Sequence, residues 1–351
     1  MSEMPEIGKI SPQIFNELIF PRLGAKNRKI LVGPQHGVDV GIVEIGGQAV
    51  SFTTDPVFIV PEYGWERAAW FAIHILASDS VTSGLKPVYM AIDLNLPMAI
   101  TREQLSLMWD TMHRECEKLG IAVITGHTAR YENCQYPMVG GATIVGIGDL
   151  DKYVSPRFIS AGDRIIITKG PAIEATGILA TMFPRLIEKK FGKAFSERAQ
   201  KIFYKMSTVE DALTAVSVGV RQDGVTALHD ATECGVWGGL YEIAQAAGLG
   251  ARVEQARIVV EDGVTEICRH FDIDPYASIS EGTLIIACRE RKAEAVVSAL
   301  ASKGIRSAIV GEFTRPEKGM VLVRNGVEGK LEHPIVDPFW RAFYGALAKP
   351  A

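Results

Sequence analysis

Three aspartates, far apart in the chain, have the right chemistry for a metal site. Asp39 lies in the run GVDVG, Asp55 in TTDP and Asp79 in ASDS, each where an expected helix or strand gives way to a loop. Magnesium prefers hard oxygen ligands and usually takes a few carboxylates, with phosphate oxygens and waters completing its shell. Spacing alone favours a structural role, in which Asp39 shapes a turn, Asp55 makes an Asx-turn and Asp79 caps a helix.

A second candidate group is Gly126, His127 and Thr128, directly after an apolar strand expected at residues 121–125. Gly126 allows the backbone to approach a ligand closely, and the Thr128 hydroxyl can donate a hydrogen bond to phosphate. Strand ends followed by small residues commonly contact ligands. A lone histidine, however, is more often structural.

A third candidate is the run HDATE at residues 229–233, which contains His229 and Asp230 and leads from a short strand into a helix. Asp230 is available as a cap, and three glycines between residues 235 and 239 leave the helix backbone bare. Free N–H groups at a helix N-terminus attract anions, but close packing of a helix on a sheet uses glycines equally well. Gly170, in KGPAIEATG, is a weaker case of the same strand-to-helix turn.

Helical and strand patterns alternate along the chain, which predicts an α/β or α+β fold with mixed sheets. We expect helices at residues 11–23, 65–83, 101–119, 172–182, 184–190, 207–218 and 236–247. We expect strands at residues 42–44, 49–53, 87–96, 121–125, 138–148, 164–168 and 225–229, and a strand-rich stretch at 282–323. Ser11 and Thr101 are expected helix caps, and Gly46-Gly47 an expected hairpin turn.

The chain has 351 residues, which favours two domains. The apolar pattern breaks between Asp151 and Gly162, so we expect domains at residues 1–152 and 153–351. The formal net charge of -4 provides no global positive field for nucleic acid or anionic lipid. Any anionic ligand must therefore be held locally.

Other sequence signals narrow the function classes. The P-loop, G-x-G-x-x-G, H-E-x-x-H and G-x-S-x-G motifs are missing, which disfavours the nucleotidases, oxidoreductases, proteases and hydrolases that carry them. The five cysteines form no C-x-x-C pair, which favours a reducing compartment. No apolar stretch is long enough to span a bilayer. We expect a cytoplasmic protein with no membrane or nucleic-acid partner.

Eight short motifs, taken in order, resemble the proteins related to aminoimidazole ribonucleotide (AIR) synthase. That superfamily also includes the hydrogenase-maturation carbamoyl dehydratase, selenophosphate synthetase and thiamine-monophosphate kinase. The motifs, each with its first residue, are GKIS (8) with FPRLG (20), GP (33) followed by GVD (37), TDP (54), SD (78), TGHT (125), GPAIE (170), HDATE (229) and EGTL (281). The resemblance covers nearly the whole chain.

The resemblance implies an N-terminal mixed-sheet domain that dimerises through its sheet, followed by a C-terminal α/β domain. ATP is then expected in a cleft between the domains, with its phosphates bridged to magnesium. The matching metal positions are Asp39, Asp55 and Asp79. The positions that match the nucleotide surroundings are Gly126, His127 and Thr128 in a loop beside the nucleotide, and Gly170, His229 and Asp230 along the cleft.

The function that the resemblance implies is an ATP- and magnesium-dependent enzyme. It would activate an amide, carboxylate or similar oxygen of an unidentified small molecule by phosphoryl transfer, a reaction that demands positioning and charge neutralisation but no covalent nucleophile. Three departures from the family pattern, Val38, Ser78 and Ala129, favour an alternative: a nucleotide-binding or scaffold homodimer with lost or reduced catalysis.

Two branches of the superfamily fit the chain less well. The hydrogenase-maturation member ends in a cysteine-bearing tail that carries its carbamoyl cargo, whereas this chain ends in GALAKPA. Selenophosphate synthetases carry a reactive cysteine or selenocysteine near the N-terminus, whereas the first cysteine here is Cys116, inside an expected helix. Neither activity is therefore expected.

Overall fold

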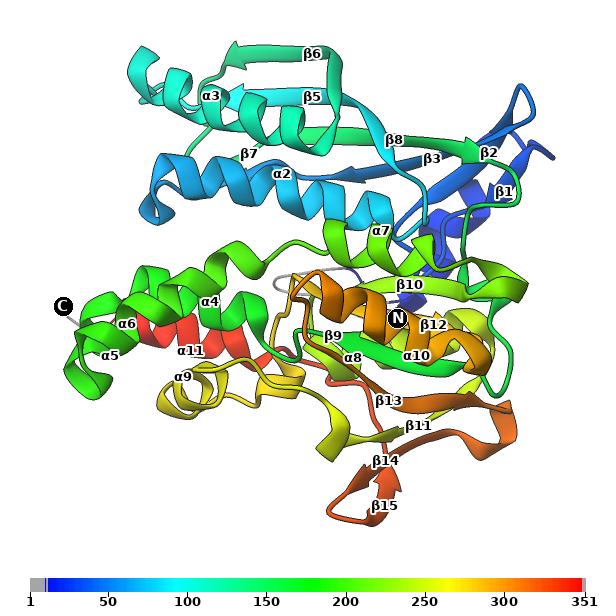
Figure 1. The fold of residues 1–351 in the computed structure, drawn as a ribbon. Coiled ribbons are helices and arrows are strands. Elements are labelled where there is room, and N and C mark those ends of the chain that lie inside the picture. Colours follow the sequence, from blue (N-terminus) through cyan, green and yellow to red (C-terminus); the bar gives the residue numbers. More distant parts are fainter. Residues whose placement is uncertain (1–9, 11, 349–351) are drawn as a thin grey trace.

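Two large sheets, one from each half of the chain, organise the computed structural model (Figure 1). The structure describes residue 10 and residues 12–348. The predicted mixed α/β fold is confirmed, because each sheet carries helices and both contain parallel and antiparallel pairs. The expected boundary between residues 152 and 153 stays a prediction, although the two sheets divide the chain near that point.

The N-terminal sheet, called sheet A here, has six strands. Their order is β1 (Ile30–Val32), β2 (Gly41–Ile45), β3 (Gln48–Asp55), β8 (Gly141–Asp149), β5 (Pro87–Leu96) and β6 (Ala122–Arg130). Gly46 and Gly47 form the predicted two-residue turn between β2 and β3, with φ of 59° and 82°. Positive φ at both positions matches the twist of a hairpin, and glycine adopts it without steric cost.

Two helices cover one face of sheet A, α2 (Trp65–Val81) and α3 (Arg102–Leu119). The predicted caps of α3 are confirmed, since Thr101 forms a capping box with Gln104 and Gly120 ends the helix in the left-handed conformation. The other face of sheet A is open, and Phe52 and Tyr89 are exposed on it.

Strand β6 differs from the expectation of a buried strand. It forms an edge of sheet A, and the side chains of Val123 and Ile124 are 40% and 60% exposed. The apolar run predicted the strand correctly. It did not show that β6 pairs with another strand, β5, on one side only.

The C-terminal sheet, called sheet C here, has seven strands. Their order is β10 (Val225–Ala231), β12 (Thr283–Cys288), β9 (Arg164–Thr168), β13 (Ser307–Thr314), β11 (Gly250–Glu254), β14 (Met320–Arg324) and β15 (Val327–Lys330). Successive residues of β9 face opposite sides: Ile166 packs in the core shared with the N-terminal half, while Ile165 and Ile167 pack in a second core. Period-two burial of this kind identifies a sheet covered on both faces.

The helices of the C-terminal half are α4 (Ile173–Met182), α5 (Pro184–Phe191), α6 (Lys193–Gln200), α7 (Val209–Ser217), α8 (Gly235–Ala247), α9 (Val264–His270), α10 (Glu290–Ser302) and α11 (Pro338–Leu347). The expected strand-rich stretch at residues 282–323 holds strands β12, β13 and most of β14, but helix α10, which was not expected, lies between β12 and β13. The apolar side of α10, Ala293, Val296 and Leu300, packs into the shared core with helical spacing. The remaining pair of short strands is β4 (Phe58–Ile59) with β7 (Met138–Val139).

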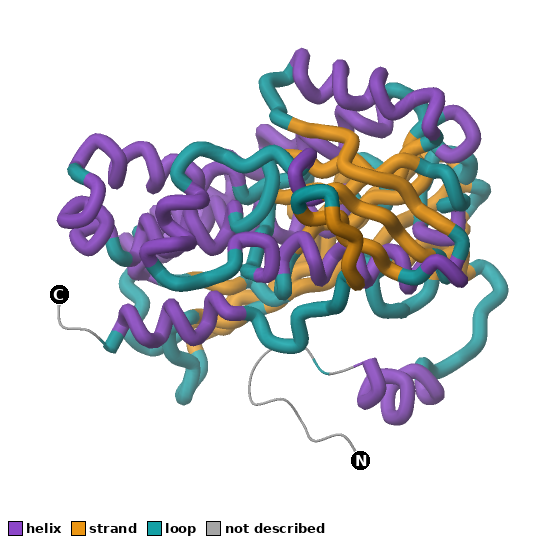
Figure 2. The backbone as a smooth tube through the Cα atoms, turned by 90° about the horizontal axis from the view of Figure 1, so that it is seen from below, coloured by secondary structure: helices purple, strands orange, loops and turns teal. Residues whose placement is uncertain are grey.

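The first expected helix is shorter and less regular than predicted. It consists of α1 (Pro12–Ile14), a π-helical turn at Phe15–Ile19 and a 3-10 turn at Phe20–Arg22. Figure 2 shows this segment, the purple coil beside the N label, lying apart from the strands. The predicted cap Ser11 lies outside the described residues.

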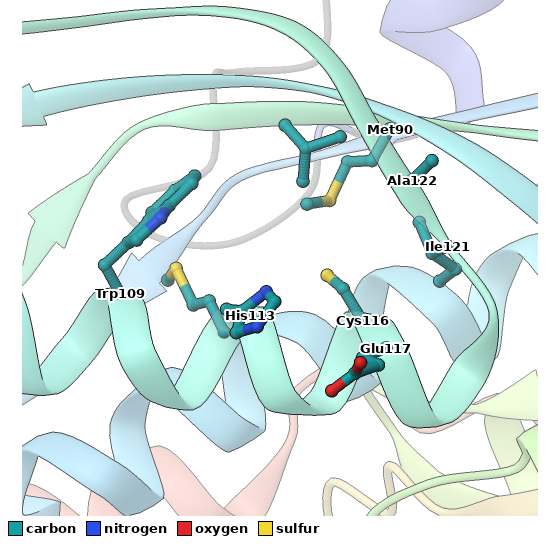
Figure 3. Close-up of a pocket in the computed structure, with 9 residues that line it drawn as sticks. Met90, Trp109, His113, Cys116, Glu117, Ile121 and Ala122 are labelled. Carbon is teal, nitrogen blue, oxygen red and sulfur yellow. The ribbon is translucent and has the colours of Figure 1, made fainter.

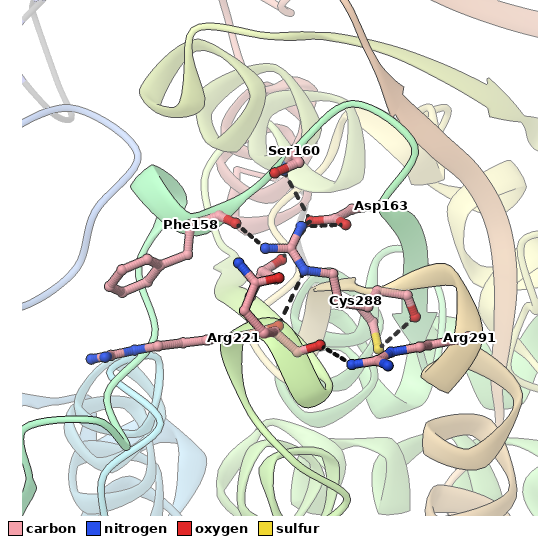
Figure 4. A network of polar contacts seen from close by, with 9 residues as sticks. Phe158, Ser160, Asp163, Arg221, Cys288 and Arg291 are labelled. Carbon is pink, nitrogen blue, oxygen red and sulfur yellow. Dashed lines mark hydrogen bonds and ion pairs between the residues drawn. The ribbon is translucent and has the colours of Figure 1, made fainter.

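One hydrophobic core spans both halves of the chain, because α2 packs on sheet A with one side and on the C-terminal half with the other. The linker is fixed as well: the N–H of Val154 donates to the carbonyl of Ser83 at 2.9 Å. At the C-terminal end of the linker, Arg289 pairs with Asp163 at 2.8 Å and donates to the carbonyl of Phe158 (Figure 4). The two halves therefore hold a defined geometry where they meet.

Candidate functional site

The three predicted metal ligands converge where the two halves meet. Asp39 precedes β2, Asp55 ends β3, and Asp79 lies in the last turns of α2. The carboxyl of Asp79 shares a hydrogen bond with Asp55, and the nearby charges of Asp230 and Asp39 raise its pKa. Asp230, from the edge strand β10 of sheet C, is 1% exposed. The structure thus brings together four carboxylates from distant parts of the sequence.

His229 joins the two halves inside this cluster. Its Nδ1 lies 2.9 Å from Oδ2 of Asp39, and its Nε2 lies 3.1 Å from Oε2 of Glu242 on α8. Burial alone would lower the pKa of His229, but the charges and hydrogen bonds of Asp39 and Glu242 raise it well above its usual value. The ring is therefore an imidazolium that donates from both nitrogens.

Asp79 holds its proton unusually tightly. Burial, the nearby charge of Asp230 and the hydrogen bond with Asp55 raise the pKa of Asp79 well above its ordinary value. Like charges this close cannot all ionise without a compensating cation. Asp79 therefore keeps its proton to a higher pH than an ordinary aspartate, and a divalent cation would compete with that proton.

Two glutamates that sequence reasoning did not assign extend the cluster. Glu281 is 2% exposed, and burial together with the charge of Asp230 raises its pKa well above normal. Its backbone N–H donates to Oε2 of Glu174 at 3.0 Å. Burial raises the pKa of Glu174 to about 8, against the opposing hydrogen bond from Glu281. The motifs GPAIE and EGTL contain these two residues, so a signal was present in the sequence.

The donor set fits magnesium. Asp39, Asp55, Asp79 and Asp230 supply the hard carboxylate oxygens that this ion prefers. One oxygen each of Asp39 and Asp230 lies within 4.8 Å of a ring nitrogen of His229. Since both of its nitrogens donate hydrogen bonds, His229 has no lone pair to offer and is better suited to orient Asp39. A cation in this cluster would also compensate the buried oxygen Oε1 of Glu281, which has no hydrogen-bond partner among the described residues.

The raised pKa of Glu174 predicts a pH effect on stability. A carboxyl with a folded pKa of about 8 stabilises the fold fully below its ordinary pKa of 4.5, and that contribution is lost as the pH rises through about 8. Glu174→Gln stays neutral at every pH. We expect it to flatten the fall in unfolding free energy between about pH 5 and pH 8 by roughly 2 to 4 kcal/mol, measured by urea titration.

The matched control for this measurement is Glu188→Gln, since Glu188 is an exposed glutamate on α5. It should leave the pH dependence as it is in the unmodified protein. An equal effect of the two substitutions would contradict the assignment of a retained proton to Glu174.

The predicted nucleotide loop at residues 126–128 is not a loop. These residues lie within β6, where His127 pairs with Asp93 of β5 and its Nε2 lies 2.8 Å from the Tyr131 hydroxyl. His127 lines a shallow hollow of about 300 Å³ on the open face of sheet A, opposite the face that α2 covers. The structure therefore does not join His127 to the aspartates within one chain.

Gly126 allows close contact with the neighbouring strand β5. A Cβ at Gly126 would lie 2.3 Å from the carbonyl oxygen of Ile92 on β5. The close backbone approach predicted here is real, but its partner is a strand. A Cβ at Gly239 would lie 2.8 Å from Ile285 of β12, which supports helix-on-sheet packing for the glycines of α8.

Gly170 borders the cluster through the loop before β12. Its carbonyl accepts a hydrogen bond from the Thr283 hydroxyl at 2.6 Å, two residues from Glu281. Its φ of +89° and the 1.9 Å from a built Cβ to the carbonyl oxygen of Val259 leave room only for glycine. This residue shapes the turn that carries Glu174 into α4.

Of the three departures from the family pattern, Ser78 has a clear role. Its hydroxyl oxygen accepts a hydrogen bond from the backbone N–H of Thr208 at 2.9 Å, with both residues fully buried. Val38 packs against the small core of β1 and β2, and Ala129 lies in β6. The polar group at position 78 therefore helps to fix α2 against the C-terminal half.

Another hollow lies elsewhere. A groove of about 370 Å³ runs between α3 and the strands β5 and β6. Figure 3 shows Trp109, His113 and Cys116 of α3 directed toward Met90 and Ala122. The groove shares no residue with the carboxylate cluster, so its size does not identify it as the site of chemistry.

Within the described residues, no helix is both long and apolar enough to cross a membrane.

Comparisons with known proteins find relatives that match most of the chain. The chain is 22% identical to a putative hydrogenase expression/formation protein of Methanocaldococcus jannaschii, over 95% of this chain and 96% of the relative. It is 26% identical to the carbamoyl dehydratase HypE of Escherichia coli, over 88% of each.

Solved structures show the same fold. The crystal structure of E. coli HypE superposes with a TM-score of 0.70 at 22% identity, covering 90% of this chain and 95% of that one. A crystal structure of hydrogenase maturation protein HypE in complex with ATP gives a TM-score of 0.66 at 20% identity, covering 95% of this chain and 97% of that one.

The family models match both halves of the chain. The N-terminal domain model of AIR synthase related proteins matches residues 37–148, and the C-terminal domain model matches residues 160–324. Together these ranges contain Asp39, Asp55, Asp79, His229 and Asp230. The chain belongs to the AIR synthase related protein family.

Proposed function

We propose that the protein is an ATP- and magnesium-dependent enzyme that activates an amide, carboxylate or similar oxygen of a small molecule by phosphoryl transfer. The observation that carries this proposal is the convergence of Asp39, Asp55, Asp79 and Asp230 at the junction of the two halves. The relative of known structure that binds ATP, HypE, shares the fold over nearly the whole chain.

In this proposal the aspartates hold magnesium, which would neutralise and orient the phosphates of ATP. His229 keeps Asp39 in place through the 2.9 Å hydrogen bond, so that this carboxylate cannot turn away from the cluster. The helix that carries Asp79 and the strand that carries Asp230 pack into one shared core, which holds these two groups in place. Such positioning is the main contribution that phosphoryl transfer asks of a protein.

Glu174 supplies a proton to the same site. With a pKa of about 8 its carboxyl is mostly protonated at neutral pH. Oε2 accepts the hydrogen bond from Glu281, which leaves Oε1 to hold the proton. A neutral carboxyl beside the phosphate site can donate to an oxygen on which negative charge develops.

Thermal melting with ATP, with and without magnesium, tests the proposal. At about 100 times its dissociation constant, ATP should stabilise the fold by roughly 2.7 kcal/mol, and this effect should need magnesium. ADP release is then followed with amide- and carboxylate-bearing small molecules. No shift in the melting temperature would contradict ATP binding, and a shift without ADP release would favour the scaffold alternative.

We further infer that two copies pair through the open face and the β6 edge of sheet A. The exposed apolar residues Phe52, Tyr89, Val123 and Ile124 gather on this face and edge. An unpaired strand with exposed apolar side chains is a ready surface for association. Light scattering should give the mass of a dimer, and Ile124→Lys should halve it; an unchanged mass would contradict the inference.

A further inference from the structure

A serine, a histidine and a glutamate are hydrogen-bonded in series beside the acidic cluster. Nδ1 of His74 on α2 lies 2.8 Å from Oγ of Ser207, just before α7. Nε2 of His74 lies 3.3 Å from Oε2 of Glu115 on α3. Trp70 stacks on the imidazole at 4.1 Å, and Nζ of Lys118 holds Glu115 at 2.7 Å. Three separate elements therefore fix one imidazole between a hydroxyl and a carboxylate.

The charges in this series set the direction of the hydrogen bonds. Burial lowers the pKa of His74, and this effect exceeds the opposing one of Glu115. Burial alone would raise the pKa of Glu115, but hydrogen bonds from Lys118 and His74 lower it. A charged Glu115 accepts from Nε2–H, so Nδ1 of the neutral ring accepts the Ser207 hydroxyl proton. This order of nucleophile, base and orienting acid activates a serine.

Ser207 is close to the proposed phosphate site. The next residue, Thr208, donates its N–H to Ser78, which neighbours Asp79. His74 and Ser78 are four residues apart on α2, which is about 6 Å along a helix axis. Lys169 places its Nζ 2.7 Å from the carbonyl of Ser207. Ser207 as a residue is partly exposed.

We propose that Ser207 is a nucleophilic serine that accepts a phosphoryl group, with His74 as its base and Glu115 as the residue that positions the base. The donor is ATP in the acidic cluster, a choice that rests on the proposed function. In the step, Oγ forms a bond to the γ-phosphorus while the bond from that phosphorus to the oxygen of ADP breaks. The hydroxyl proton passes to Nδ1 of His74.

Diisopropyl fluorophosphate tests the nucleophile without ATP, because attack by Oγ displaces fluoride from phosphorus. Peptide mapping by mass spectrometry should find the label on Ser207. The label should disappear in Ser207→Ala and form at least about tenfold more slowly in His74→Gln. Glu115→Gln should also slow it, while Ser106→Ala, an exposed serine of α3, should react like the unmodified protein.

The pH profile separates an activated serine from a merely structural hydrogen bond. Glu115 and Lys118 from α3, and Lys169 from the turn before α4, are the charged groups that act on His74. The labelling rate should stay level above pH 6.5 and fall only below the lowered pKa of His74. Absence of label on Ser207 in folded protein, or equal rates with and without His74, would overturn the proposal.

Incubation with γ-³²P-labelled ATP and magnesium tests the donor. Acid-stable phosphoserine at position 207, absent from Ser207→Ala, is the expected result. If ATP shifts the melting temperature and releases ADP but leaves no phosphoserine, the donor is wrong and the proposed function stands. If ATP does not bind but diisopropyl fluorophosphate labels Ser207, the proposed function fails and the activated serine stands.

Discussion

Replacing Asp79 with asparagine is expected to stabilise the protein without ligand and to abolish its stabilisation by magnesium and ATP. The raised pKa of Asp79 shows that its negative charge is unfavourable beside Asp55 and Asp230. An amide is neutral without taking up a proton, so the cost of protonating Asp79 on folding disappears; that cost is about 1.4 kcal/mol for each unit by which the folded pKa is raised, up to the working pH. The same change removes one ligand of the cation, so the stabilisation of about 2.7 kcal/mol at saturating ATP is lost.

Urea unfolding of both proteins, with and without magnesium and ATP, measures both effects. Asp110→Asn is the control, because Asp110 is an exposed aspartate on α3 and lies outside the cluster. It should change neither the stability nor the response to ligand. If Asp79→Asn destabilises the unliganded protein, or keeps its response to magnesium and ATP, the carboxylate cluster is not the cation site.

The elements with strong local signals were predictable from the sequence. Helix α3 carries both of its end signals within its own sequence, a capping box at Thr101 and a left-handed Gly120. Strand β5 follows the predicted bounds Pro87–Leu96, because its apolar run is long and ends at a proline. Local sequence decides such elements, and tertiary contacts only place them.

Elements whose character depends on distant partners were not predictable in the same way. The apolar run of β6 is typical of a buried strand, yet its exposure follows from its place at the edge of sheet A. Gly126 indicated a close approach, but nothing local shows that Ile92 is the partner. Helix α10 was missed because short apolar runs of helices and strands look alike without a clear end signal.

The residues of the acidic cluster also differ in how far the sequence predicted them. Asp39, Asp55 and Asp79 were identified through the family resemblance, whereas their spacing alone favoured three separate structural roles. Glu174 and Glu281 are 107 residues apart and meet through one backbone hydrogen bond. Only the fold shows that both side chains are buried and that the charge of Glu174 adds to the raised pKa of Glu281, so their raised pKa values could not be predicted from sequence patterns.

His229→Ala is expected to cost about 3 to 5 kcal/mol of unfolding free energy. The substitution leaves the carboxylates of Asp39 and Glu242 without the buried cation between them, and removal of one partner from a buried charge pair has this order of cost. It also breaks the direct bond between the two halves at the site. Chemical denaturation at neutral pH measures the loss, and magnesium binding should weaken in parallel.

The matched control is His333→Ala. His333 contacts the same glutamate, with its Nε2 3.7 Å from Oε1 of Glu242, but its side chain is 32% exposed. Its removal should cost less than about 1 kcal/mol, as for other partly exposed ion pairs. Equal losses of unfolding free energy for the two histidines would show that burial between Asp39 and Glu242 does not determine the cost of removing His229.

The pH dependence of the unfolding free energy tests the charge of His229 most directly. The folded pKa of His229 lies well above the ordinary 6.5, so its contribution is complete below pH 6.5 and is lost as the pH rises through the folded value. The difference in stability between the unmodified protein and His229→Ala should therefore shrink on the alkaline side. A difference that grows with pH would mean that the ring is neutral in the folded protein, and Asp39 would then be held by something other than a cation.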